Sequence, residues 1–226
     1  MSLYSIAHKM QKHVPWLWAA IENVNEELFL IRYGRKLKNI LEEEQFGLYV
    51  YKRLTDENAM ELLQLLNCQP KESFEYFKPH AFDALTIKRL LKNKSYLAYG
   101  VWDNEKMVGY YFLRSYFIGK AYLGKLVDVN YWGKGIGKQM CLHLMDVATA
   151  LGMHMYETIS KENLSSLYAT QKVLDTKVIK ELPNNYLYIE DVRRKSLGGV
   201  VLCLIIIDGR EPIIELGCRR GYAYAA

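Results

Sequence analysis

The chain has few cysteines and no long apolar segment, and each absence excludes a class of protein. Its 226 residues contain four cysteines, none in a Cys-x-x-Cys pair, so neither a disulfide framework nor a zinc site is indicated. The longest apolar run, residues 200–207, is far shorter than the ~20 residues that a membrane-spanning helix needs. Residues 1–15 also lack the apolar centre of a signal peptide. We therefore predict a cytoplasmic protein with no metal and no membrane partner.

Basic and acidic residues are nearly balanced in number. The 30 basic and 25 acidic residues give a net charge of +5, which is too small to indicate nucleic-acid binding. The same mild positive charge suits an anionic small ligand. Half of the residues are hydrophobic and 24% are charged, as in a globular domain with a sizeable core. The length fits one domain, alone or with an extension.

The first predicted element is a helix over residues 13–41, with Pro15 at a first-turn position. Five apolar residues recur in it at spacings of four, three, four and three, which places them on one helical face. Three interpretations of this face stay open: packing on the domain surface, contact with a second copy or another partner, and contact with a membrane surface. The five residues are Leu17, Ile21, Val24, Leu28 and Ile31.

The rest of the chain alternates between strand and helix patterns. We divide it into an N-terminal helical extension (1–45), a central domain (46–190) and a C-terminal tail (191–226). The tail is interpreted either as extra strands of the sheet or as an artefact of the sequence. The predicted elements of the central domain are a strand at 46–54, a helix capped by Thr55, a helix at 82–93, strands at 95–103, 106–117 and 121–129, a helix at 135–151, a strand at 154–160, a helix at 164–174 capped by Asn163, and strands at 176–180 and 186–190.

The most informative stretch is VDVNYWGKGIGK, residues 127–138, where three glycines follow an apolar strand and open a helix. It lacks the third glycine of a dinucleotide fingerprint, and Gln139 stands where a P-loop needs Ser or Thr. What remains is a helix N-terminus whose free N–H groups a phosphate can approach closely. Lys134 and Lys138 add positive charge. The pattern suits a pyrophosphate.

This stretch resembles motif A of the GNAT superfamily, the acyl-CoA-dependent N-acetyltransferases, whose pattern is Arg/Gln-x-x-Gly-x-Gly/Ala. Gly135 and Gly137 match the two glycines, and Trp132 stands at the Arg/Gln position. Asn163 and Ser166 match a second motif, in which an Asn opens the helix after the next strand. The family's usual Tyr seven residues after that Asn is Thr170 here. The resemblance covers roughly residues 46–190.

The resemblance implies an α/β fold: a GNAT-like mixed, largely antiparallel sheet flanked by helices, behind an N-terminal helical extension. It implies an N-acetyltransferase that moves an acetyl group from acetyl-CoA to a primary amine of a small molecule. A non-catalytic acyl-CoA-binding or regulatory module is the alternative, and an interaction protein is a third. The residues implied to bind acetyl-CoA are Val127, Asp128, Val129, Trp132, Gly133, Lys134, Gly135, Ile136, Gly137, Lys138, Asn163 and Ser166.

The chemistry needs a base for the amine, a donor for the thioester carbonyl and an acid for the thiolate. The resemblance implies that a main-chain N–H near Val127 or Val129 is the donor. Glu157, on the next strand, is our first candidate for the base, and Tyr168 for the acid. Tyr122, Asp128 and His80 are further candidates, each of which also has a structural interpretation.

The acceptor is expected to lie against residues 70–85, the hairpin near residue 104 and the loop 182–186. The first of these segments is rich in aromatic rings, on which a sugar ring can stack, so an amino-sugar nucleotide is one predicted acceptor. The same rings are also suited to core packing. They are Phe74, Tyr76, Phe77 and Phe82.

Overall fold

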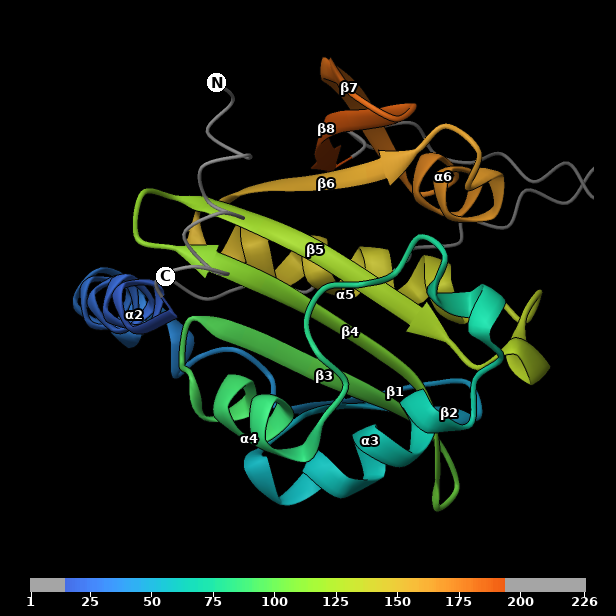
Figure 1. The fold of residues 1–226 in the computed structure, drawn as a ribbon, viewed down its shortest axis with the longest axis horizontal. Helices are drawn as coiled ribbons and strands as arrows, with labels where there is room; N and C mark the ends of the chain where they lie inside the picture. The colour runs from blue at the N-terminus through green and yellow to red at the C-terminus, as the bar shows by residue number, and fades with distance from the viewer. Residues whose placement is uncertain (1–14, 194–226) are drawn as a thin grey trace, which may run out of the picture. The chain divides into compact units, whose positions relative to one another are not determined.

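The computed structural model describes residues 15–193, and these residues build one eight-stranded sheet (Figure 1). The strands lie in the order β1-β2-β3-β4-β5-β6-β8-β7, and only the β5–β6 pair is parallel. This is the mixed, largely antiparallel sheet that was predicted. The strands are β1 (Glu43–Phe46), β2 (Tyr49–Arg53), β3 (Tyr96–Asp103), β4 (Lys106–Tyr116), β5 (Lys120–Val127), β6 (His154–Ser160), β7 (Leu174–Leu182) and β8 (Tyr186–Arg193).

Helices cover both faces of the sheet. Figure 1 shows α3 and α4 in front of the strands, α5 behind them and α2 at one side. The helices are α2 (Pro15–Leu37), α3 (Ala59–Asn67), α4 (Ala84–Lys92), α5 (Ile136–Leu151) and α6 (Leu164–Gln171), with short 3₁₀ turns η1 (Asp56–Asn58), η2 (Lys71–Phe74) and η3 (Val129–Tyr131).

Each helical layer buries its own apolar cluster against the sheet. The cluster on the α5 face includes Leu144 and Ala121, and the cluster on the α3–α4 face includes Leu62 and Leu126. β5 contributes to both clusters because successive side chains of a strand point to opposite faces. Odd-numbered side chains of β5 therefore face α5, and even-numbered ones face α3 and α4.

Short-range signals in the sequence located most element ends correctly. Gly152 ends α5 in the left-handed conformation, and the Asn163 side chain caps α6 by accepting the N–H of Ser166. The predicted turn at residue 104 joins β3 and β4, and Asn104 has a φ of 53°. The strand predicted at 46–54 is present as β2, but it begins later than predicted, and the strand β1 before it was missed. Gly47 turns the chain with a φ of 60°, so β1 and β2 form a hairpin there.

The apolar face of α2 departs from our first interpretation of it. The helix does pack on the domain surface, but not through this face, because Ile21, Val24, Leu28 and Ile31 are all exposed. The helix contacts the domain through a different side, which buries Phe29 and Tyr33.

The sheet begins and ends three residues outside the predicted central domain of 46–190, at Glu43 and Arg193. The division into extension, domain and tail stays a prediction, and the predicted tail lies almost wholly outside the described residues. Within residues 15–193, no helix has the length and apolar character needed to cross a membrane.

Candidate functional site

β5 and β6 are paired at one end only. Their parallel pairing covers three residue pairs and ends at Tyr122 and Tyr156. Beyond these tyrosines the strands separate, and Figure 1 shows the two ribbons running apart. β5 keeps its pairing with β4, and β6 keeps its pairing with β8. We call the edge of β5 that β6 leaves, residues 123–127, the open edge.

The open edge presents main-chain groups that β4 does not use. The N–H of Asp128 donates to the carbonyl of Val108 at 2.9 Å, so Asp128 faces β4. Successive residues of a strand alternate their main-chain groups between its two edges. Leu123, Lys125 and Val127 therefore turn their N–H and C=O groups away from β4. An extended ligand can add to this edge as a further strand would.

The open edge leads into the glycine turn at the N-terminus of α5. Gly133 and Gly135 have φ values of 76° and 83°, which favour glycine. A Cβ built on either would meet no described atom within 4 Å, so the space beside the turn is open. Among the described residues, no hydrogen bond takes up the N–H groups of residues 133–137. These groups, at a helix N-terminus, form a site suited to a phosphate.

Side chains of the turn fold back onto its flanks. The indole N–H of exposed Trp132 donates to the carbonyl of Val127 at 3.0 Å. The ammonium group of Lys134 lies 4.0 Å from the centre of the Tyr131 ring, a cation–π contact. Lys134 and half-buried Lys138 thus add positive charge beside the free N–H groups.

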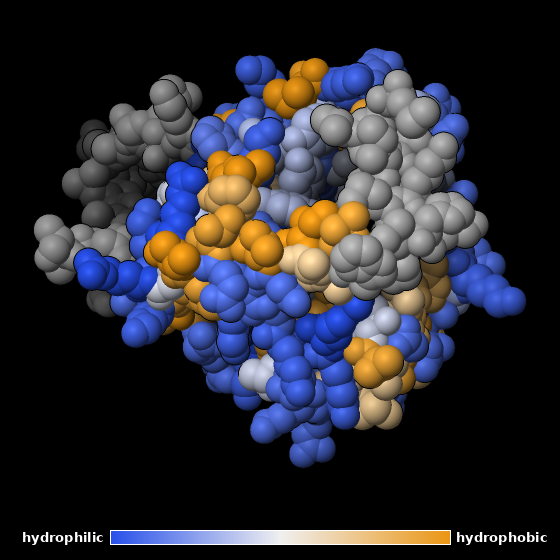
Figure 2. Space-filling view, turned by 60° about the vertical axis from the view of Figure 1, so that its left-hand side comes forward, coloured by the Kyte–Doolittle hydropathy of each residue, from blue (hydrophilic) through white to orange (hydrophobic). Residues whose placement is uncertain are grey.

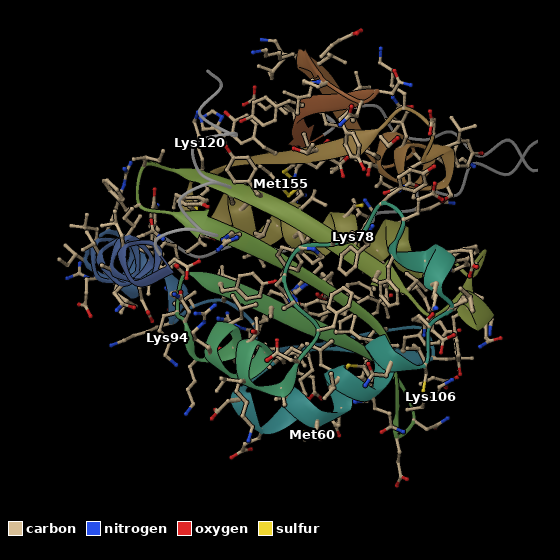
Figure 3. All side chains as sticks on the ribbon, in the orientation of Figure 1. Met60, Lys78, Lys94, Lys106, Lys120 and Met155 are labelled. Carbon is tan, nitrogen blue, oxygen red and sulfur yellow. The ribbon has the colours of Figure 1, made fainter. Side chains whose placement is uncertain are left out.

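Asp128 fixes the entry to the turn. Its buried carboxylate accepts the main-chain N–H of Asn130 at 3.0 Å and pairs with Lys106 at 3.0 Å. Burial alone would raise the pKa of Asp128, but these hydrogen bonds and the charge of Lys106 lower it below its usual value. A pocket of about 300 Å³ adjoins it on the α3 side, lined in part by Gln64 and Cys68. Figure 3 labels Lys106 at this end of the sheet and Lys120 at the opposite end.

Of the two N–H groups predicted to contact a thioester carbonyl, only one faces the open edge. The N–H of Val129 already donates to Oε1 of Gln69 at 3.1 Å. The N–H of Val127 is turned away from β4 by the alternation of the strand. Val127 is therefore the better placed donor.

A buried charged cluster lies under the divergence, on the α5 face. Nζ of Lys125 lies 3.5 Å from Oε2 of Glu157 and donates to Oγ1 of Thr170 at 2.9 Å. The side chains of Lys125 and Glu157 are only 8% and 5% exposed. Among the described residues, Oε1 of Glu157 and both carboxylate oxygens of buried Asp191 have no hydrogen-bond partner.

The protonation states in this cluster depend on one another. Burial raises the pKa of Asp191 to about 8, and the charge of Glu157 raises it as well. Burial alone would lower the pKa of Lys125, but the nearby acidic groups of Cys141, Glu157 and Asp191 raise it above its usual value. Burial also raises the pKa of the Cys141 thiol, so this thiol keeps its proton at neutral pH.

The opposite face of the divergence carries three tyrosines, one each from β5, β6 and β8. We call Tyr122, Tyr156 and Tyr188 the tyrosine platform; their ring centres are 5.4–6.2 Å apart. The hydroxyls of Tyr122 and Tyr188 are 3.2 Å apart. Burial and the hydrogen bond with Tyr122 raise the pKa of Tyr188, so this hydroxyl keeps its proton at neutral pH. Oε1 of Glu190 lies at the edge of the platform, 3.5 Å from the Tyr156 hydroxyl.

The structure does not bring the two predicted catalytic side chains together. Glu157 is buried on the α5 face, whereas Tyr168 is 59% exposed on α6. The hydrogen bond and charge of Lys172 lower the pKa of Tyr168. Thr170, at the position of the family's usual tyrosine, is fully buried. The catalytic roles of Glu157 and Tyr168 stay predictions.

The aromatic connection before α4 is used largely for packing. Phe74, Phe77 and Phe82 pack against the cluster on the α3–α4 face, which agrees with the core interpretation of these rings. Nε2 of His80 lies 3.1 Å from the Tyr110 hydroxyl, and burial lowers the pKa of this histidine. The connection crosses in front of β4, where Figure 3 labels Lys78.

Several residues of the site were not predicted, among them Lys125, Tyr188 and Asp191. Lys125 is a lysine inside the apolar strand AYLGKLVDV, and that anomaly was a usable signal. Tyr188 and Asp191 gave no such signal, because their positions depend on how β8 pairs with β6. Strand register over this distance is not visible in the sequence.

The sequence of the chain matches a known protein family. A sequence model of the acetyltransferase (GNAT) family matches residues 59–174, just over half of the chain. The chain therefore belongs to the acetyltransferase (GNAT) family, and the class of protein is an acyltransferase. No curated protein sequence matches the chain significantly.

Solved structures share the fold at low sequence identity. The GNAT domain of S. lividans PAT has 14% identity and a TM-score of 0.57 over 67% of this chain and 95% of that one. The ribosomal-protein-S5-alanine acetyltransferase from Vibrio fischeri has 14% identity and a TM-score of 0.55, over 68% and 97%. The PaiA N-acetyltransferase from Thermoplasma acidophilum, in complex with coenzyme A, has 15% and 0.55, over 65% and 99%.

Metal ligands were not predicted from the sequence. Within the part of the chain that the structure describes, no group of three or more His, Cys, Asp and Glu side chains is placed to hold a metal ion. The prediction of a metal-free protein is not tested by this observation.

Proposed function

We propose that the protein transfers an acetyl group from acetyl-CoA to a primary amine of a small molecule. The observation that carries the proposal is the divergence of β5 from β6 beyond Tyr122 and Tyr156, which leaves this edge of β5 without a neighbouring strand up to the glycine turn. The family and the folds of its relatives support acetyl transfer in general. An amine as the acceptor and a CoA thioester as the donor go beyond this general support and are part of the proposal.

In this proposal the pyrophosphate of acetyl-CoA binds the free N–H groups of residues 133–137. Lys134 and Lys138 add attraction for the anion. The open edge binds the extended pantetheine arm through its main chain, and the N–H of Val127 is the proposed donor to the thioester carbonyl. Asn163 and Ser166, at the N-terminus of α6, are proposed to bind the same co-substrate. Acetyl-CoA supplies the activated acetyl group.

Glu157 is kept as the proposed base. It lies on β6 one residue beyond the end of the pairing with β5, and its Oε1 is buried without a partner among the described residues. Lys125 pairs with the other carboxylate oxygen and holds the side chain in place.

Two hydroxyls are candidates for the acid that protonates the leaving thiolate. Tyr168 was predicted from the sequence, and its lowered pKa suits proton transfer. Tyr188 lies at the tyrosine platform beside the end of the β5–β6 pairing and keeps its proton at neutral pH. Tyr168→Phe and Tyr188→Phe separate the two, because only loss of the acid lowers kcat while acetyl-CoA binding is retained.

The acceptor amine is proposed to bind on the tyrosine platform. Flat tyrosine rings offer a stacking surface and polar edges for the body of the acceptor, and its amine is proposed to reach between the separated strands β5 and β6 to Glu157 on the other face. Because Phe74, Phe77 and Phe82 pack against the apolar cluster on the α3–α4 face, the platform is proposed in their place as the support for a ring-shaped acceptor. An amino-sugar nucleotide is the first acceptor to test, and simple primary amines are the second.

The first test is calorimetric titration with acetyl-CoA, with ATP as a control ligand. We expect binding of acetyl-CoA and no comparable binding of ATP. Thiol release from acetyl-CoA is then measured with a panel of amines. Binding without turnover for any amine would favour the non-catalytic alternative, and no binding by the folded protein would overturn the proposal.

A matched pair of glycine variants locates the phosphate site. Gly135→Val places a β-branched residue at a φ of 83° and a side chain in the space proposed for the pyrophosphate, so acetyl-CoA binding should be lost. Gly47→Val is the control, because Gly47 has a φ of 60° and open space but lies in the β1–β2 turn. Equal loss in both variants would mean that backbone strain, and not the site, explains the result.

A further inference from the structure

The side of α2 that contacts the domain is mainly polar. The Glu22 side chain pairs with Arg114, and the Asn25 side chain donates to the carbonyl of Ser115 at 3.0 Å. The main-chain N–H of Lys94 donates to Glu26 at 2.7 Å. Together with buried Phe29 and Tyr33, these contacts fix the rotation of the helix about its own axis.

This rotation leaves the apolar stripe of α2 in solvent. Ile21, Val24, Leu28 and Ile31 are 44%, 59%, 37% and 81% exposed. At 100° per residue they lie within an arc of about 80°. Phe117 and Ile118 of the β4–β5 turn are exposed beside them, because Asn25 and Arg32 both hydrogen-bond the main chain of Phe117.

The surface therefore has a continuous apolar region where a helix packed on its own domain would show polar residues. Figure 2, which brings the α2 side forward, shows a band of apolar residues across this face. Contiguous exposed apolar surface on a soluble protein marks an interaction site.

The spacing and the charges of the stripe point to a particular partner. Spacings of three, four and three place Ile21 and Leu28 at a positions and Val24 and Ile31 at d positions of a heptad. Glu27 is then at g and Arg32 at the following e. In a parallel pair of such helices, each g residue lies beside the e residue five positions later in the partner.

We propose that the α2 stripe binds the α2 stripe of a second copy of this chain, in parallel about a two-fold axis. Glu27 of each copy then lies beside Arg32 of the other, so one charge pair is made twice. An antiparallel pair would instead bring the flank that carries Glu27 against the same flank of the partner, and the flank that carries Arg32 against its own copy, so that like charges repel on both sides. The charge arrangement thus favours a second copy in the parallel orientation.

The first test is sedimentation velocity from low to high micromolar concentrations of the full chain. The wild type should shift from monomer to dimer, and Ile31→Glu should stay monomeric because it buries a charge in the contact. Leu85→Glu is the matched control, since Leu85 is 82% exposed on α4 and lies outside the stripe. A wild type that stays monomeric throughout would overturn the proposal; the stripe would then have another occupant, such as another part of this chain, a different protein or a membrane surface.

The second test determines whether the two α2 helices are parallel. It changes charged residues only and leaves the apolar stripe intact. Glu27→Arg alone and Arg32→Glu alone should each weaken the dimer, because each places like charges at both contacts. A mixture of the two variants should form a heterodimer, in which both contacts again join opposite charges. Failure of the mixture to associate while the wild type dimerises would refute the parallel arrangement.

Discussion

The buried pair of Lys125 and Glu157 allows a quantitative test of how the site is held. Replacing Lys125 with Met leaves Glu157 buried without its counter-ion. Breaking a buried pair in this way costs ~3–5 kcal/mol of the free energy of unfolding. Glu157→Leu should cost less, because Lys125 keeps Thr170 as an acceptor and Asp191 as a nearby acidic group.

The two single variants and the double variant form a double-mutant cycle, and the double variant is the decisive measurement. Replacing a buried ion pair by apolar residues of similar volume is often close to neutral, so Lys125→Met with Glu157→Leu should cost ~2 kcal/mol or less. The two changes are then strongly non-additive. Urea unfolding followed by circular dichroism at pH 7 measures all four proteins, and their m values should agree.

An exposed ion pair, Lys161 with Glu181, is the control that separates the effect of burial from the effect of distance. Nζ of Lys161 lies 2.9 Å from Glu181, closer than in the buried pair, but the two side chains are 43% and 70% exposed. Lys161→Met should therefore cost less than ~1 kcal/mol. If Lys125→Met were as mild as Lys161→Met, or if the double variant equalled the sum of its parts, burial of the ion pair would not stabilise the site as argued. Thiol release by the double variant also tests Glu157 as the base, since activity that survives the change would refute that role.

Two further predictions concern pH and packing. Because the pKa of Asp191 is raised from 3.8 to about 8 in the folded chain, the folded state holds a proton that the unfolded state releases, and stability should fall as pH rises between these values, by at most ~1.4 kcal/mol per pH unit. Asp191→Asn should flatten this fall in urea titrations at pH 5, 6 and 7, and parallel curves for the two proteins would contradict the assignment. Phe29→Ala should cost ~3–5 kcal/mol, whereas Ile31→Ala, two residues away but 81% exposed, should cost less than ~0.5 kcal/mol in the monomer. Similar losses in thermal unfolding would mean that α2 is rotated differently on the domain.

Local patterns predicted most of the fold because local chemistry determines most of its elements. The αL glycine after α5 and the Asn163 cap need only their neighbours in sequence, and both were located correctly. The hairpin at Gly47 was missed because FGLYVYKRL is apolar on both sides of the glycine, so the turn left no polar signal.

The candidate site could be proposed from the sequence only where one short segment builds it. The glycine turn is such a segment, and its open backbone agrees with the motif. The charged cluster and the tyrosine platform combine β5, β6 and β8, whose register no local signal specifies. The rotation of α2 was unpredictable for a related reason. Its apolar stripe indicates a contact, but the contacts of Glu22, Asn25 and Glu26 and the burial of Phe29 and Tyr33 turn the stripe away from the domain.

The hydrogen bond from Trp132 to Val127 occupies an acceptor that the proposed co-substrate would use. A ligand that adds to the open edge and approaches the carbonyl of Val127 from the side of the indole N–H, which now lies 3.0 Å from it, displaces that N–H. A hydrogen bond of this kind contributes ~1 kcal/mol, which corresponds to about a fivefold weaker apparent affinity. Trp132 thus sets a threshold at the entrance to the site. A residue with no donor in that place would lower the threshold and leave the rest of the turn unchanged.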